Sequence, residues 1–188
     1  MGDLLCKTKT YITKKLSFIS KILYKLNVKP NHLTVLGLIS GLTASILILL
    51  NQIQISILFL ILACLFDVLD GALARNFNLS TSFGSFLDSV CDRFVDVTIL
   101  ISIGYTFKIN YFVITLTILF TLMVSYTRAR AECFIEKCDV GICERSERLI
   151  LILIGLTFNV INFIIYIILI LSIVTVVQRI LYTYKKLK

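Results

Sequence analysis

The 188-residue sequence predicts an all-α integral membrane protein, in which six transmembrane helices follow a cytoplasmic amphipathic juxtamembrane helix. The chain is 58% hydrophobic and 16% charged, whereas soluble domains contain about 45–50% apolar and 25% charged residues. One proline and eight glycines are compatible with long, unbroken helices. This composition excludes a disordered chain, a collagen-like repeat and a disulfide scaffold.

The N-terminal segment, residues 1–29, has the pattern of an amphipathic helix. Apolar residues recur at steps of three and four from Ile12 to Leu26, and several lysines fall on another face. A basic amphipathic helix binds anionic headgroups at the membrane surface. We therefore expect this segment to lie along the inner leaflet, with a flexible basic tail as the alternative.

The rest of the chain is rich in apolar windows of membrane-spanning length, which is about 20 residues. These windows cover residues 31–50, 56–75, 83–105, 111–134, 144–160 and 163–182, with short connections. We expect residues 30–188 to form one six-helix membrane domain.

The basic residues predict the orientation of these spans. The formal charge of +8 would suggest nucleic acid binding in a polar chain, but in this apolar chain it points to the membrane, and we expect no nucleic acid partner. If the N-terminus is cytoplasmic, Lys108 is the one basic residue in an external connection. The positive-inside rule thus places both termini and the active site on the cytoplasmic side of a multi-pass cell-membrane protein.

Acidic residues inside apolar segments are the most informative feature. Asp67 and Asp70 are three residues apart, and Asp88 and Asp92 are four apart, so each pair lies on one helix face. A charge at mid-bilayer costs at least about 2.5–3.5 kcal/mol, which indicates function. Because the second and third spans are antiparallel neighbours, we expect the two faces to meet at their cytoplasmic ends.

The ligands available on these faces are carboxylate oxygens, which select hard cations such as Mg²⁺, Mn²⁺ or Ca²⁺. Two such ions side by side commonly catalyse transfers at phosphorus. A cation transporter also uses intramembrane carboxylates and remains the non-enzyme alternative.

The segment from Asp67 to Asp92 reads D-x2-D-G-x2-A-R-x8-G-x3-D-x3-D. This pattern resembles the signature of the CDP-alcohol phosphotransferase (CDP-alcohol phosphatidyltransferase) family, with all eight fixed positions present. The resemblance implies a membrane enzyme of phospholipid synthesis that uses two divalent cations, Mg²⁺ or Mn²⁺. Its reaction would transfer a phosphatidyl or archaetidyl group from CDP-diacylglycerol or CDP-archaeol to an alcohol and release CMP.

The resemblance also implies roles for individual residues. Asp92 would be the catalytic base on the acceptor hydroxyl. The metal ligands would be Asp67, Asp70, Asp88 and Asp92, and the CDP-lipid would contact Thr34, Asp67, Gly71, Ala74 and Arg75.

Arginines near the predicted cytoplasmic ends of three later spans are candidates to bind the second substrate, the acceptor. The segments 125–132 and 141–149 resemble the phosphatidylinositol-phosphate and archaetidylinositol-phosphate synthase branch, in which Arg128, Arg148 and Arg179 would hold the phosphate of inositol phosphate. Glycerol-3-phosphate is the rival acceptor. The alternative without a ligand is that the arginines pair with acidic neighbours, namely Asp96, Glu132, Glu144 and Glu147.

Gly37 and Gly41 form a pattern of small residues that serves either packing within one chain or dimerisation. Because the family is commonly dimeric, the resemblance implies a homodimer.

Overall fold

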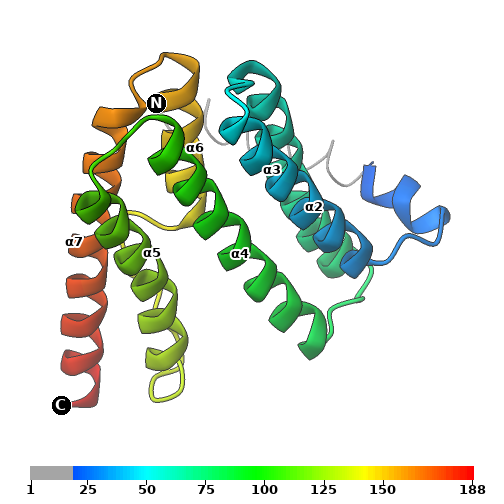
Figure 1. The fold of residues 1–188 in the computed structure, drawn as a ribbon. Helices are drawn as coiled ribbons and strands as arrows, with labels where there is room; N and C mark the ends of the chain where they lie inside the picture. The colour runs from blue at the N-terminus through cyan, green and yellow to red at the C-terminus, as the bar shows by residue number, and fades with distance from the viewer. Residues whose placement is uncertain (1–18) are drawn as a thin grey trace, which may run out of the picture. The chain divides into compact units, whose positions relative to one another are not determined.

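The computed structural model describes residues 19–188, and over this range the chain is helical and contains no strand (Figure 1). A helix that ends at Lys25 precedes α2. The helices are α2 (Pro30–Leu49), α3 (Ile53–Asn76), α4 (Ser82–Thr106), α5 (Tyr111–Ala131), α6 (Arg145–Thr157) and α7 (Ile161–Leu187). The predicted all-α class is confirmed for these residues. Most of the expected juxtamembrane helix lies outside the described residues.

Within residues 19–188, four helices are long and apolar enough to cross a membrane: α2, α3, α5 and α7. α4 carries three aspartates and an arginine. α6 has 13 residues, a length of about 20 Å at 1.5 Å per residue, which is shorter than the hydrocarbon core. Each helix lies where the sequence predicts one. The four long apolar helices identify a membrane protein. The number of spans stays a prediction.

Several helices end on a residue in the left-handed conformation. After each such end, an amide donates to the carbonyl five residues earlier, for example Gln52 N to Leu47 O at 2.9 Å and Leu79 N to Ala74 O at 2.9 Å. This is the hydrogen bond of the Schellman motif, and asparagine tolerates its positive φ better than most residues. The residues with positive φ at these helix ends are Asn27, Asn51, Asn78, Lys108 and Asn159.

The chain divides into two compact units. Of the described residues, the first unit comprises residues 19–43 and Leu58–Val95, and the second comprises Ala44–Ile57 and Asp96–Lys188. In the first unit a Cβ on Gly41 would lie 2.6 Å from the Val95 methyl carbons, so this glycine allows α2 and α4 to approach closely. Gly41 therefore serves packing within the chain, whereas dimerisation stays a prediction.

The second unit is built around α7. α5 and α7 run side by side, and α6 also packs against α7 (Figure 1). The buried face of α7 includes Ile161, Ile165 and Ile168, none more than 1% exposed. Farther along the same helix, Thr175 and Arg179 are also buried, which places polar groups between the helices.

Candidate functional site

Three of the predicted metal ligands come together in the first unit. Asp67 and Asp70 on α3 and Asp88 on α4 each offer a carboxylate oxygen, and these oxygens lie within 4.8 Å of one another. Asp70 is 7% exposed. Its Oδ2 accepts a hydrogen bond of 2.7 Å from Thr34 Oγ1, which fixes the carboxylate against α2. The spacing argument for antiparallel acidic faces is thus confirmed for these three residues.

Asp92 is not a member of this group of three. It lies one turn beyond Asp88 on α4, and its Oδ2 is 3.6 Å from Arg93 Nη1. Its side chain is 15% exposed. Its role as the catalytic base therefore stays a prediction.

A cavity of about 170 Å³ adjoins the acidic group in the first unit. It receives side chains from the start of α2, the end of α3 and the start of α4. Of the five predicted CDP-lipid contacts, Thr34, Gly71, Ala74 and Arg75 line it, whereas Asp67 is not among its lining residues. Asp70 and Asp88 also line it, as do residues of the α3–α4 connection that the sequence did not single out: Leu79, Ser80 and Thr81.

Two motif glycines leave room at this cavity. A Cβ on Gly84 would lie 2.8 Å from Asn31 Oδ1 and 2.9 Å from Thr81 Oγ1, which is closer than real contacts allow. Thr81 Oγ1 accepts a 3.0 Å hydrogen bond from the Gly84 amide and so caps the start of α4. A Cβ on Gly71 would lie 3.1 Å from Arg75 Nη1, so the lack of a side chain at Gly71 leaves space for the Arg75 guanidinium. The arginine is thereby held beside the cavity, where it can pair with phosphate oxygens.

The donor set of the acidic group fits a divalent cation. The group offers carboxylate oxygens as ligands, and Asp70 is buried. In the described part of the chain no His or Cys joins the group. Three carboxylates at this separation repel one another, and a hard cation removes that repulsion. The residues present therefore fit magnesium or manganese.

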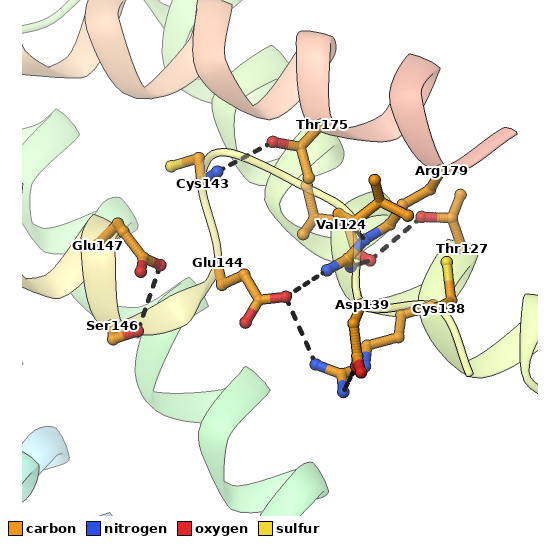
Figure 2. Close-up of polar contacts among 12 residues, drawn as sticks. Val124, Thr127, Cys138, Asp139, Cys143, Glu144, Ser146, Glu147, Thr175 and Arg179 are labelled. Atoms are coloured by element: carbon orange, nitrogen blue, oxygen red, sulfur yellow. Dashed lines mark hydrogen bonds and ion pairs between the residues drawn. The ribbon is translucent and has the colours of Figure 1, made fainter. Parts of the chain in front are cut away.

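In the second unit, α7 contributes Arg179, whose side chain is 2% exposed. Its Nε donates to Val140 O at 2.8 Å, and its Nη1 donates to the carbonyl of Val124. Its Nη2 lies 2.8 Å from Glu144 Oε1 (Figure 2). Two backbone carbonyls thus fix the guanidinium plane, and the third donor points toward a carboxylate.

Arg128, near the end of α5, is surrounded by three carboxylates. Its Nε is 3.1 Å from Glu132 Oε1, its Nη2 is 3.3 Å from Asp139 Oδ1 and its Nη1 is 3.5 Å from Glu144 Oε1. Arg128 and Arg179 thus converge on one oxygen of Glu144. Figure 2 shows the contact between Glu144 and Arg179.

Arg148 of α6 has a different partner. Its Nη2 lies 2.6 Å from Asp96 Oδ2, with the two side chains 4% and 7% exposed. Arg145 Nε is 3.6 Å from the other oxygen of Asp96. The expected pairing with acidic neighbours is therefore present for Arg128, Arg148 and Arg179, although their acidic partners differ.

Glu147 differs from the other acidic neighbours named from the sequence, because its hydrogen-bond partner is a serine and not an arginine. Glu147 accepts a 3.2 Å hydrogen bond from Ser146. Asp139, which the sequence did not single out, contacts Arg128. A lone aspartate in a polar connection gives no signal for such a contact, because the pairing depends on how residues 132–144 fold back.

Gly141 explains that fold and was also missed as a site residue. Its φ of +144° is disfavoured for other residues, and a Cβ there would lie 2.6 Å from Thr175 Cγ2. Beside it, the Cys143 amide donates to Thr175 Oγ1 at 3.1 Å (Figure 2). This glycine therefore lets the connection between α5 and α6 lie flat on α7 and bring Glu144 to Arg179.

Replacement of Gly141 by alanine is expected to disrupt this connection. The strained φ and the clash with Thr175 should lower the free energy of unfolding by about 1–3 kcal/mol. Thermal denaturation of the purified protein in detergent measures this change, and Gly37→Ala is a matched control because its Cβ would meet ordinary contacts at 3.5 Å. Equal melting temperatures for the two variants would contradict the prediction.

Known proteins of similar sequence point to the same kind of enzyme as the residues of the site. Residues 27–182 match the family CDP-alcohol phosphatidyltransferase. The chain is 39% identical to the archaetidylinositol phosphate synthase of Pyrococcus horikoshii, over 98% of this chain and 99% of the relative.

Solved structures of Mycobacterium tuberculosis phosphatidylinositol phosphate synthase are also similar. The structure with CDP-DAG bound has a TM-score of 0.80 and 25% identity, covering 90% of this chain and 93% of that one. The structure in complex with manganese and citrate has the same TM-score and identity, covering 90% and 88%. Three carboxylates of the motif from Asp67 to Asp92 come together beside a cavity, and the family match covers residues 27–182. This chain therefore belongs to the CDP-alcohol phosphatidyltransferase family and is an enzyme that uses divalent metal ions.

Proposed function

We propose that the enzyme transfers the phosphatidyl or archaetidyl group of a CDP-linked lipid to a hydroxyl of inositol phosphate and releases CMP. The acceptor oxygen forms a bond to the phosphorus that carries the lipid, and the bond from that phosphorus to CMP breaks. The observation that carries the choice of acceptor is the convergence of Arg128 and Arg179, from two helices, on one carboxylate oxygen. Guanidinium groups that converge on one oxygen are also suited to a phosphate.

The cavity of the first unit supports the assignment of the CDP-lipid. In this proposal Asp67, Asp70, Asp88 and Asp92 hold the metals, which neutralise phosphate oxygens and stabilise the departing CMP. Thr34, Gly71, Ala74 and Arg75 receive the nucleotide and its pyrophosphate. Thr34 donates to Asp70 and orients that carboxylate.

Asp92 is proposed to take the proton of the acceptor hydroxyl. It lies one helical turn from Asp88 and is partly exposed, so its carboxylate is accessible. A nearby dication lowers the pKa of a carboxylate and weakens it as a base, but it also acidifies a hydroxyl bound beside it.

The second substrate is proposed to bind at Arg128, Arg148 and Arg179. These arginines contact Glu144 and Asp96. An acceptor phosphate therefore has to compete with carboxylates of the protein for the guanidinium groups.

The membrane arrangement is proposed from the sequence together with the helices. α2 to α7 form six spans, with residues 1–29 along the inner leaflet, both termini and the active site facing the cytoplasm, and two chains associating as a homodimer. Four apolar helices among residues 19–188 support the spans, and the basic residues at their predicted cytoplasmic ends support the orientation.

The test is release of CMP by the purified enzyme in the presence of CDP-archaeol or CDP-diacylglycerol and Mg²⁺. Addition of inositol phosphate is expected to raise CMP release at least about 100-fold above the level without acceptor, because a positioned acceptor gives a high effective concentration. A response to glycerol-3-phosphate but not to inositol phosphate would reassign the acceptor. Cation flux in liposomes without CMP release would instead favour a transporter.

A further inference from the structure

The Glu144 carboxylate occupies the two arginines that the proposed function assigns to the acceptor phosphate. Its Oε1 is 2.8 Å from Arg179 Nη2 and 3.5 Å from Arg128 Nη1. The Glu144 side chain is 40% exposed, whereas that of Arg179 is 2% exposed. An anion that arrives from solvent therefore meets Glu144 before it reaches Arg179.

Arg179 is held in this orientation independently of Glu144. Its Nε and Nη1 donate to the carbonyls of Val140 and Val124. Because two of the three donor nitrogens are engaged by the backbone, the guanidinium cannot turn to follow a departing carboxylate. Displacement of Glu144 would leave Nη2 in place and available to another anion.

The charge of this cluster disfavours simple addition of a phosphate. Arg128, Arg179 and Lys137 carry three positive charges, and Glu132, Asp139 and Glu144 carry three negative charges, so the six side chains sum to zero and the arginines are already balanced. A phosphate monoester carries about −1.5 to −2 at neutral pH. Phosphate binding therefore requires that at least one carboxylate leave the arginines.

Glu144 is the carboxylate whose departure requires the smallest rearrangement. It lies just before α6 with an extended backbone and makes no capping hydrogen bond through its side chain. Glu132, in contrast, contacts Arg128 one helical turn along and also accepts from the Cys138 amide. Asp139 contacts Arg128 but not Arg179 and has a second partner in Lys137.

We propose that Glu144 is an internal occupant of the acceptor-phosphate site and determines its specificity for phosphorylated acceptors. This inference rests on the proposed function. The phosphate of the acceptor displaces the carboxylate by virtue of its higher charge, and an uncharged polyol, which has no such group, leaves Glu144 on the arginines. The site thereby selects a phosphorylated alcohol over the same alcohol without phosphate.

The test is the variant Glu144→Gln, which retains the shape of the side chain and removes its charge. The KM for inositol phosphate is expected to fall about five-fold, the size of one partly exposed ion pair, with kcat and the KM for the CDP-lipid unchanged. Inhibition by inorganic phosphate should strengthen by a similar factor. A residue with a merely structural role would not improve acceptor binding.

Asp139→Asn is the matched control, because it removes the same charge from the same connection but contacts Arg128 alone of the two arginines. Its effect on the KM is expected to be less than half that of Glu144→Gln. Should Glu144→Gln fail to fold, judged by its melting temperature, Glu144→Asp provides the second measurement. Its shorter side chain no longer reaches both arginines, so the KM should again fall.

Arg179→Ala separates this inference from the proposed function. If Arg179→Ala raises the KM for inositol phosphate and Glu144→Gln lowers it, both stand. If Arg179→Ala raises the KM and Glu144→Gln leaves it unchanged or raises it, the role of Glu144 is wrong and the acceptor site stands. An unchanged KM in Arg179→Ala would remove the acceptor site itself.

Discussion

Replacement of Asp88 by asparagine is expected to reduce CMP release at least about 100-fold, because loss of one of the proposed metal ligands removes several kcal/mol of transition-state stabilisation. Asp88 offers one of the three carboxylate oxygens that lie within 4.8 Å of one another, and it is the member of the group that α4 contributes. Asparagine retains the size of the side chain but loses the negative charge. The rate measured at saturating Mg²⁺ and CDP-lipid reports the effect.

Binding of Mn²⁺ to the same variant, followed by electron paramagnetic resonance, distinguishes loss of metal from loss of fold. Weaker binding with an unchanged melting temperature is the expected pair of results. Glu136→Gln is the matched control, since Glu136 is exposed and lies outside the acidic group, so its neutralisation should leave both rate and metal binding intact. Wild-type activity in Asp88→Asn would exclude Asp88 as a metal ligand.

The sequence located the helices well because the signals are local. Apolar windows predict each helix within a few residues. In the structure, asparagines at positions 27, 51, 78 and 159 lie at helix ends, where their tolerance of positive φ is used. The fifth window, residues 144–160, is longer than the helix Arg145–Thr157 because the chain turns at Phe158 and Asn159 before α7. Apolar content alone does not distinguish such a turn from a helix.

The acidic group was predictable for a related reason. The three-residue and four-residue spacings define faces of α3 and α4, and a short connection makes these helices neighbours in the first unit. The sequence could not show that Thr34 of α2 donates to Asp70, since that contact joins residues 36 positions apart.

The partners of the arginines depend on a single backbone conformation that periodicity cannot reveal. Gly141, at φ +144°, turns the connection between α5 and α6 toward Thr175 and Arg179. From the sequence, Glu144 was one of several acidic residues able to pair with an arginine. Its position between two arginines follows from the path of this connection.

The pair formed by Asp96 and Arg148 is expected to contribute most to stability among the ion pairs of the second unit. The side chains of Asp96 and Arg148 are 7% and 4% exposed, and the two are joined by a contact of 2.6 Å. Asp96→Asn leaves a buried guanidinium without its carboxylate, a change that costs about 3–5 kcal/mol. Lys137→Gln should cost much less, because the Lys137–Asp139 pair joins side chains that are 78% and 55% exposed, and exposed pairs contribute about 0–1 kcal/mol. Thermal denaturation in lipid bicelles compares the two variants, and equal melting temperatures would contradict the prediction.

The Asp96→Asn variant also tests whether Arg148 binds the phosphate of the acceptor, as proposed. If Arg148 binds the phosphate of the acceptor, inositol phosphate replaces the missing anion in Asp96→Asn and stabilises the folded state by mass action. The melting temperature of Asp96→Asn should then rise more with saturating inositol phosphate than that of the wild type, in which Asp96 already occupies Arg148. An equal rise in both proteins would mean that Arg148 serves the fold through Asp96, and the acceptor phosphate would be left to Arg128 and Arg179, the two arginines that share Glu144.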